Sequence, residues 1–303
     1  MIYDVYHKTV YRYGLAVSMS HHLLHLEPRD TGHQQVEWFA LRVDPEPGFD
    51  DRSTDAFGNP TRTITLDQSH DRLVIEAESR VHVAHRELPD PLATPPWEDV
   101  AGLRLAAMDD PSLDASRFAF ASPFVELDDA LELYARQSFT PGRPILDAAI
   151  DLNRRIFEDF TFDPTATTLA TPVAEVFARR RGVCQDFSHL MLACLRAIGL
   201  AARYQSGYLL TRPPEGQVKL VGADASHAWV ALYVPRSGWV ELDPTNNCLP
   251  MQEHVTLGWG RDYSDVSPVA GIVYGGGSHD PEVAVDVSPV AAPTLAPGIR
   301  TAG

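Results

Sequence analysis

The first part of the chain carries short apolar runs separated by clusters of proline, glycine and aspartate. The runs at 3–7, 38–43 and 72–77 have the length and the β-branched or aromatic content of strands. The segment 55–60 between two such runs has the composition of a turn. Short strands with frequent turns are typical of sandwich folds, so we predict a β-sandwich-like domain over residues 1–85.

Apolar residues recur at helical spacing from about residue 126, and strand-like runs follow them. Leu127, Leu131 and Tyr134 lie on one face of a predicted helix, and Pro144 is placed to open the next one. The later predicted elements are helices that begin at residues 171 and 184 and strands at 201–210, 226–234 and 238–243. This order predicts an α+β core in which helices pack on an antiparallel sheet.

These patterns divide the chain into four parts. The β domain (1–85) is followed by a linker or wrapping segment (86–125), in which prolines and acidic residues show no period. The α+β core covers 126–286, and the chain ends in a predicted tail at 287–303.

Composition and charge narrow the classes of partner. The 303 residues are 44% hydrophobic, enough to bury a full core, and carry a formal net charge of -16. This charge repels phosphate groups, so we predict no nucleic-acid partner and no binding to an anionic membrane surface. No apolar stretch has the roughly 18 residues that a spanning helix needs, and the first residues lack the form of an export signal. We therefore expect a cytoplasmic protein.

The chain has three cysteines without CxxC spacing, Cys184, Cys194 and Cys248. This odd set favours neither a disulfide framework nor a structural zinc site, and it allows a reactive thiol. His21 and His22 stand near other histidines and acidic residues, but they would point to opposite faces of a strand. We therefore predict no metal site and no cofactor.

Cys184 is the first candidate for chemistry, because it follows a glycine turn and opens an apolar run. Residues 180–187 read Arg-Arg-Gly-Val-Cys-Gln-Asp-Phe. The amide groups and the dipole of a helix start favour the thiolate, which is the attacking form of a cysteine. Cys184 is also in phase with the buried stripe of this helix, so an ordinary core cysteine is the alternative interpretation.

A histidine and an aspartate lie on neighbouring predicted strands. His227 is near the start of the first strand, and Asp243 ends the second, after a Pro-Arg-Ser-Gly turn. They share one face of the sheet only if the pairing register of the hairpin is even. A four-residue loop would separate them, so this prediction needs a bulge, for which Gly238 is the natural place. With that register, Asp243 can orient the His227 ring, which can meet the Cys184 thiol across the helix–sheet interface.

Three blocks of the sequence resemble those of a known family. They are 182–187 (Gly-Val-Cys-Gln-Asp-Phe), 226–230 (Ser-His-Ala-Trp-Val) and 238–245 (Gly-Trp-Val-Glu-Leu-Asp-Pro-Thr). Together they look like the three blocks of the bacterial transglutaminase-like superfamily, whose core also resembles that of papain-type cysteine proteases. The segment 3–83 resembles the β-rich N-terminal region that accompanies this core, and 260–268 resembles a C-terminal signature.

The resemblance implies a fold and a set of roles. The fold is an N-terminal β-sandwich-like domain joined to a transglutaminase-like or papain-like α+β core. The implied roles are nucleophile for Cys184, general base for His227 and orienting acid for Asp243. The acyl acceptor stays open, since members of the family are described as transglutaminases, proteases or amidases.

Residues around this triad are candidates for binding the substrate or the developing oxyanion. Trp229 and Trp239 flank it on the same strands, either as walls of a substrate groove or as core residues. The backbone amide of Cys184 is one oxyanion donor. The candidates for a second donor or another contact are Tyr204, Gln205, Tyr208 and Gln185.

These observations predict cysteine-dependent acyl transfer on peptide or carboxamide bonds, through a thioester that is released to water or to an amine. The predicted partner is a peptide or protein substrate, and the sequence leaves a homo-oligomer open. The alternative is a non-catalytic peptide-binding or assembly module on the same fold.

Overall fold

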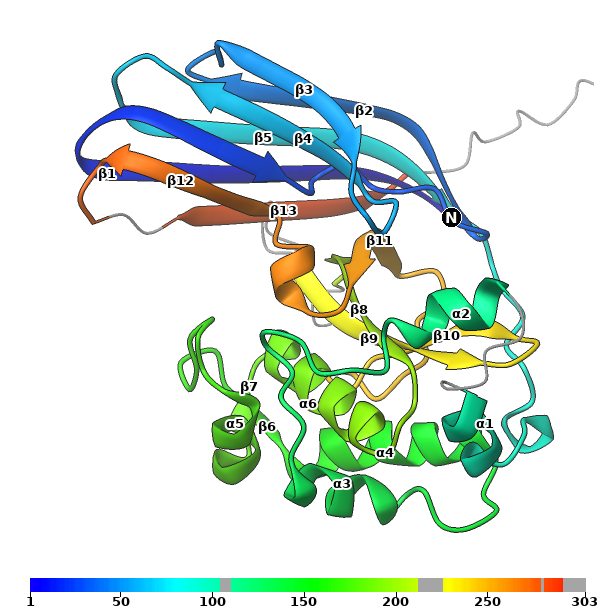
Figure 1. The fold of residues 1–303 in the computed structure, drawn as a ribbon. Coiled ribbons are helices and arrows are strands. Elements are labelled where there is room, and N and C mark those ends of the chain that lie inside the picture. Colours follow the sequence, from blue (N-terminus) through cyan, green and yellow to red (C-terminus); the bar gives the residue numbers. More distant parts are fainter. Residues whose placement is uncertain (104–109, 212–225, 279–280, 291–303) are drawn as a thin grey trace, which may run out of the picture.

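The alternating strands of the N-terminal region build one antiparallel sheet, drawn at the top of Figure 1. The computed structural model describes residues 1–103, 110–211, 226–278 and 281–290. β1 (Ile2–Leu24) buries every second side chain over its first residues, because polar and apolar residues alternate there. The other strands of this sheet are β2 (Gln34–Asp44), β3 (Phe49–Thr54), β4 (Pro60–Leu66), β5 (His70–Val83), β12 (Val269–Gly275) and β13 (Glu282–Pro289).

The strands of this sheet lie in four rows: β1 forms one row alone, and each of the other rows contains two strands. On one side of β1, β5 pairs with residues 2–17 and β4 with residues 20–24. On the other side, β13 pairs with residues 3–10 and β12 with residues 17–24. β2 and β3 form the outer row against β5 and β4. The predicted β-rich region is confirmed, and its strands form a single sheet because β1 is long enough to pair with two strands along each edge.

The chain returns to this sheet after the core, which corrects two predicted boundaries. β12 and β13 fall within the range predicted as core, 126–286, yet both pair with β1. β13 also continues to Pro289, so the tail predicted at 287–303 begins inside a strand. The physical reason is the alternation along β13, which buries Val285 and Val287 against residues of β1 and β5.

The segment predicted as a linker, 86–125, crosses the outside of the core and joins it. It contains the short helices η1 (Pro91–Ala93), α1 (Trp97–Leu103) and α2 (Asp110–Ser116). Trp97 packs edge-on against Phe139, with ring centroids 5.9 Å apart. Val100 and Val125 are buried in the same apolar cluster, so this segment wraps the core.

The core packs helices on a four-stranded antiparallel sheet, as predicted. The strand order is β10-β9-β8-β11. The strands are β8 (Ala202–Leu209), β9 (Ser226–Val234), β10 (Gly238–Leu242) and β11 (His254–Gly260). The helices are α3 (Asp129–Arg136), α4 (Ile145–Asp159), α5 (Val173–Arg179) and α6 (Cys184–Ala197), accompanied by β6 (Thr161–Phe162), β7 (Arg181–Gly182) and η2 (Tyr263–Asp265).

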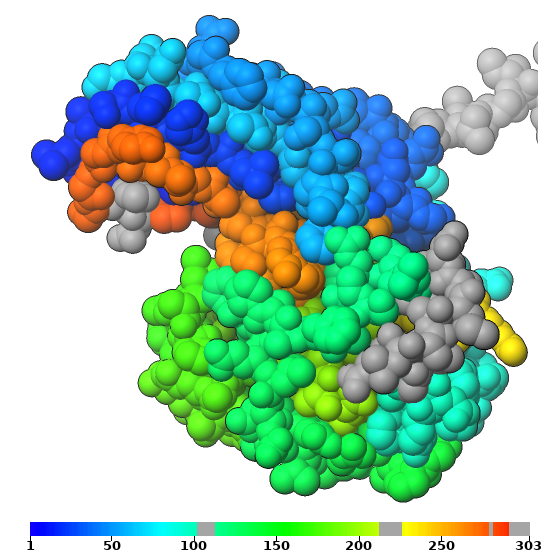
Figure 2. All heavy atoms as spheres, in the orientation of Figure 1, coloured from blue at the N-terminus to red at the C-terminus, as the bar shows by residue number. Residues whose placement is uncertain are grey.

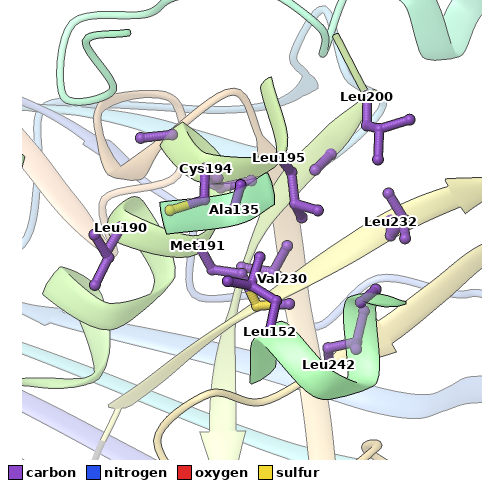
Figure 3. Close-up of a cluster of buried hydrophobic side chains, with 14 of the residues drawn as sticks. Ala135, Leu152, Leu190, Met191, Cys194, Leu195, Leu200, Val230, Leu232 and Leu242 are labelled. Atoms are coloured by element: carbon purple, nitrogen blue, oxygen red, sulfur yellow. The ribbon is translucent and has the colours of Figure 1, made fainter. Parts of the chain in front are cut away.

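The central helix of the core is α6, whose residues 186–196 are all buried. Figure 3 shows Met191 of this helix near Leu152 of α4 and Val230 of β9. Burial on all sides is typical of a helix that is enclosed by other elements. Within the described ranges, no helix combines the length and the apolar character that a bilayer crossing requires.

Two side-chain amides join the N-terminal region to the edge strand β11. Gln34 donates to the carbonyl of Thr256 at 2.7 Å and accepts from its amide at 2.8 Å. Asn59 bonds Trp259 in the same way, at 2.8 and 3.0 Å. Each amide replaces a neighbouring strand and satisfies backbone groups that would otherwise be unpaired. The β-rich lobe therefore sits directly on the core, as Figure 2 shows.

The pairing of β13 can be tested with two valines of the same strand. Val287 is 0% exposed and Val283 is 53% exposed. We expect Val287→Ala to lower the free energy of unfolding by about 2 kcal/mol, because it deletes buried methyl groups and leaves a cavity. Val283→Ala is the matched control, and chemical denaturation measures both. Equal effects of the two substitutions would contradict the docking of β13.

Candidate active site

Helix α6 begins at Cys184 because the residues before it are tied to the first turn. The amide of Val183 donates to Asp186 Oδ2 at 2.8 Å, and Thr167 Oγ1 donates to the same oxygen at 2.6 Å. A side chain at Gly182 would come within 2.7 Å of Asp186, so glycine allows this close approach. Cys184 therefore occupies the first helical position, where the backbone amides have no partner within the helix.

The hairpin of β9 and β10 has the even register that the predicted site requires. Val234 pairs with Gly238, and the pairing continues without a shift to the end of β10. The loop therefore has three residues, and the predicted four-residue loop with a bulge is wrong. Gly238, with a φ of +76°, is instead the first residue of β10. His227 and Asp243 consequently share one face of the sheet.

Asp243 is fully buried and accepts five hydrogen bonds. His227 Nε2 donates to its Oδ2 at 2.7 Å, and His254 Nε2 donates to the same oxygen at 3.0 Å. Asn246 Nδ2 donates there as well, at 2.7 Å. The backbone amides of Thr245 and Asn246 donate to Oδ1 at 2.9 and 3.1 Å. The carboxylate therefore places the Nε2 hydrogen of His227 and fixes the orientation of its ring.

Two members of this cluster, His254 and Asn246, were missed by the sequence analysis. His254 opens β11, which lies at the opposite edge of the sheet from β10, and no sequence spacing relates it to Asp243. The contact of Asn246 could have been predicted from the sequence, since Asn246 follows Asp243 in an Asp-Pro-Thr-Asn segment that is typical of a turn.

In this cluster, burial and hydrogen bonds shift the pKa values of Asp243 and His227 in opposite directions, and the hydrogen bonds have the larger total effect. Burial alone would raise the pKa of Asp243, but hydrogen bonds from His227 and His254 hold that pKa well below its usual range. Burial would likewise lower the pKa of His227, but hydrogen bonds with Asp243 and Cys184 raise it to about 10. At neutral pH the ring is therefore an imidazolium beside a carboxylate.

The thiol of Cys184 lies beside the His227 ring and contributes to its raised pKa, and both residues line the same cleft. Since Nε2 is engaged with Asp243, Nδ1 is the ring nitrogen left for an interaction with the sulfur. The alternate residues of β9, Ala228 and Val230, pack with α6 in the core, which puts His227 on the other face of the sheet. The contact is made around the end of the sheet, because His227 is the second residue of β9. The prediction that it crosses the helix–sheet interface is corrected accordingly.

Cys184 and His227 open into a cleft of about 350 Å³ between the core and the N-terminal sheet. Gln185 and Tyr204, both predicted as site residues, line this cleft. The residues that the N-terminal sheet contributes to its lining are His7, Thr9, Tyr11, Val269 and Val283. The cleft is thus bounded by both parts of the molecule and has the size of a small-ligand or peptide-side-chain site.

The two predicted tryptophans do not line the cleft. Trp229 is fully buried and stacks on the His227 ring, with centroids 5.9 Å apart. Its Nε1 donates to Glu241 at 2.8 Å. Trp239 packs edge-on against Phe118, with centroids 5.3 Å apart. Of the two alternatives, core packing is the one that the structure shows for Trp229.

Of Tyr204, Gln205 and Tyr208, the three residues of β8 predicted as possible second oxyanion donors, only Tyr204 lines the cleft. It is 2% exposed, and its hydroxyl makes no hydrogen bond within the part of the chain that the structure describes. The hydroxyl of Tyr208 is instead bonded to His7 Nδ1 at 2.9 Å. Gln205 is fully buried and does not line the cleft.

The cluster of His227, Asp243 and His254 has the residue types of a metal site, with ligand atoms within 4.8 Å of one another. The same atoms bond each other directly, at 2.7 and 3.0 Å, so the carboxylate holds both rings. His21 is exposed and His22 is buried, as alternation along β1 requires.

Titration of His227 tests this electrostatic arrangement. Because the pKa is raised from 6.5 to about 10, the stability that this ring contributes is fully present below pH 6.5 and is lost as pH rises through 10. We expect the ring nitrogens of His227 to titrate near pH 10 in NMR spectra. In Cys184→Ala, the midpoint should fall but stay above 6.5, because Asp243 remains. A midpoint at or below 6.5 in the parent protein would contradict the arrangement.

Comparison with known proteins agrees with this fold. Residues 3–82 match the family described as the bacterial transglutaminase-like N-terminal region. Residues 134–244 match the transglutaminase-like superfamily, and they contain Cys184, His227 and Asp243.

Similar proteins occur in several bacteria. An uncharacterized protein of Mycobacterium tuberculosis is 40% identical over 301 residues, which cover 95% of this chain and 92% of that protein. A protein-glutamine gamma-glutamyltransferase of Pseudomonas aeruginosa is 34% identical over 106 residues, 31% of this chain and 15% of that protein. The crystal structure of a putative cysteine protease from Cytophaga hutchinsonii has the same fold, with a TM-score of 0.77 and 18% identity over 96% of this chain and 91% of that one. The chain therefore belongs to the transglutaminase-like superfamily, in the form that carries the bacterial N-terminal region.

Proposed function

We propose that the protein is a cysteine-dependent acyl-transfer enzyme that acts on peptide or carboxamide bonds through a thioester. The observation that carries the proposal is the series of contacts from Cys184 to His227 to Asp243, at the wall of a cleft. A cysteine that only fills the core neither opens into a cleft nor bonds to an imidazolium. That description applies instead to Cys194, which is 0% exposed.

The geometry supports a two-step reaction. In the first step, the sulfur of Cys184 attacks the carbonyl carbon, and the C–N bond breaks as His227 Nδ1 gives its proton to the leaving amine. In the second step, water or a primary amine attacks the thioester carbon and gives a proton back to His227. The C–S bond then breaks and the sulfur leaves as a thiolate. Asp243 holds the ring and offsets its positive charge throughout.

Two groups are placed to stabilise the negative oxygen that forms during both steps. The first is the backbone amide of Cys184, at the start of α6. The second is the hydroxyl of Tyr204, which lines the same cleft. Burial, together with nearby Cys184, raises the pKa of Tyr204 well above its usual value, so this hydroxyl stays protonated and can donate.

The name of the Pseudomonas aeruginosa relative, a protein-glutamine gamma-glutamyltransferase, supports transfer to an amine as one form of this reaction. Hydrolysis is the other form, because water can replace the amine once the thioester exists. The two forms share every residue of the proposed site and differ only in the second nucleophile.

Thiol labelling and product analysis test the role of Cys184. Burial raises the pKa of Cys194 and of Cys248 to about 12, so both should react slowly with iodoacetamide at pH 7, whereas Cys184 should react much faster. With a library of peptide amides, with and without a primary amine, we expect Cys184→Ala to lose at least ~10³-fold in rate. Cys248→Ser is the matched control. Equal labelling of Cys184 and Cys248, with no product, would favour a non-catalytic peptide-binding module.

The role of Tyr204 is tested by removing its hydroxyl. We expect Tyr204→Phe to lower kcat by ~10²-fold with little change in KM, because an oxyanion donor acts on the transition state. Tyr208→Phe deletes a hydroxyl that lies outside the cleft and serves as the control. A change in KM alone, or equal effects of the two substitutions, would show that Tyr204 is not a donor to the oxyanion.

A further inference from the structure

Arg203 is a buried arginine on the face of the core sheet that points away from α6. It projects from β8 and is 7% exposed. Its guanidinium carbon lies 4.3 Å from the ring centroid of Trp239 and 3.6 Å from that of Trp259, so the charge is stacked between two indoles. Arg29 lies 3.3 Å from the centroid of Trp259, and two guanidinium groups this close to one ring must occupy its opposite faces.

The guanidinium of Arg203 has no hydrogen-bonding partner among the residues that the structure describes. Its Nε is buried and unsatisfied, and none of the described carboxylates forms an ion pair with it. Arg196 shows the ordinary arrangement for comparison, since it is equally buried but donates to three backbone carbonyls. Burial lowers the pKa of Arg203 to about 9, despite the attraction of Glu241. A buried charge without a partner is costly, which points to a missing anion.

Arg203 lines a cavity of about 280 Å³ that shares no residue with the cleft of Cys184. The two indoles form part of its wall, together with Leu88 and Val240. Arg86 and Glu241 also line it and carry charges. The cavity is therefore partly apolar and large enough for a molecule of a few carbon atoms.

Among the residues that line this cavity, one positive charge has no hydrogen-bonded counter-charge. Arg86 donates to both carboxylate oxygens of Glu241, at 3.0 and 3.1 Å, so these two charges offset each other. Burial and the charge of Arg86 lower the pKa of His33, so its ring is neutral at pH 7. Glu87 is an exposed lining residue whose charge is screened by water. The remaining charge is that of Arg203.

We propose that this cavity binds a small organic monocarboxylate, with the carboxylate on Arg203 and the hydrocarbon part against the two indoles. The planar guanidinium group can donate two parallel hydrogen bonds to a carboxylate. A single uncompensated charge close to Glu241 disfavours a dianion such as phosphate. The apolar wall favours an anion that carries carbon atoms. A free acid and the C-terminal carboxylate of a peptide share this chemistry.

Thermal unfolding and tryptophan fluorescence test the proposal on the full chain. The test ligands are butyrate and N-acetylleucine, and sodium chloride at equal ionic strength is the reference. Inorganic phosphate and N-acetylleucine amide are the negative controls. At a hundredfold excess over Kd, we expect a bound carboxylate to raise Tm by roughly 5 °C and to change the emission of the flanking indoles. Phosphate and the amide should give neither effect. Tighter binding of N-acetylleucine identifies a peptide terminus as the source, and tighter binding of butyrate identifies a free acid.

Arg203→Met keeps the aliphatic contact with both rings and removes the charge, and Arg42→Met changes an exposed arginine as the control. We expect Arg203→Met to weaken carboxylate binding about 10- to 100-fold and, without ligand, to unfold no more easily than the parent protein. Arg203→Lys, which keeps the charge but loses the planar fork, should bind with intermediate affinity and covers the case in which the methionine variant does not fold. The proposal is wrong if the parent protein responds to carboxylates no more than to chloride, if phosphate binds better, or if Arg203→Met retains the response.

Discussion

The carboxylate of Asp243 is fully buried and accepts hydrogen bonds from two imidazoles, one side-chain amide and two backbone amides. Without these donors a buried carboxylate would take up a proton, since desolvation disfavours its charge. Because the imidazoles come from β9 and β11, the same carboxylate ties two strands together at the end of the sheet. The orientation of His227, its raised pKa and its contact with Cys184 all depend on this one negative charge.

The core sheet separates two kinds of environment. The face that meets α6 is apolar, with Val230, Leu232 and Leu242 packed in the main cluster. The opposite face carries buried polar groups, among them Trp229 bonded to Glu241 and Glu241 paired with Arg86. Breaking such a buried pair by removing one partner typically costs about 3–5 kcal/mol. Arg86 lies just after β5, at the start of the segment that wraps the core, so this segment supplies a counter-charge to the core sheet. The N-terminal sheet supplies a wall of the cleft.

Local sequence patterns predicted much of the fold and the three residues of the proposed triad. The helix start at Cys184 and the alternation around His227 are determined by neighbouring residues, and so they could be recognised. The loop before Gly238 was assigned the wrong length because Arg236 adopts a φ of +69°, a conformation that side chains other than glycine and asparagine rarely take. His254 was missed because its contact depends on the path of the chain between two strands that are not neighbours. Val287 was assigned to a tail because the proline and glycine content around it outweighed a short alternation.

The return of β12 and β13 to β1 makes the core an insertion between the first and last rows of a single sheet. During synthesis on the ribosome, β1 therefore has one edge without its final partners until β12 and β13 have emerged. Residues of the last strands also line the cleft, including Val269 and Val283. A nascent chain that has already folded its central helix thus still lacks part of the cleft wall, and the pocket around the thiol is completed only after β13 has been synthesised.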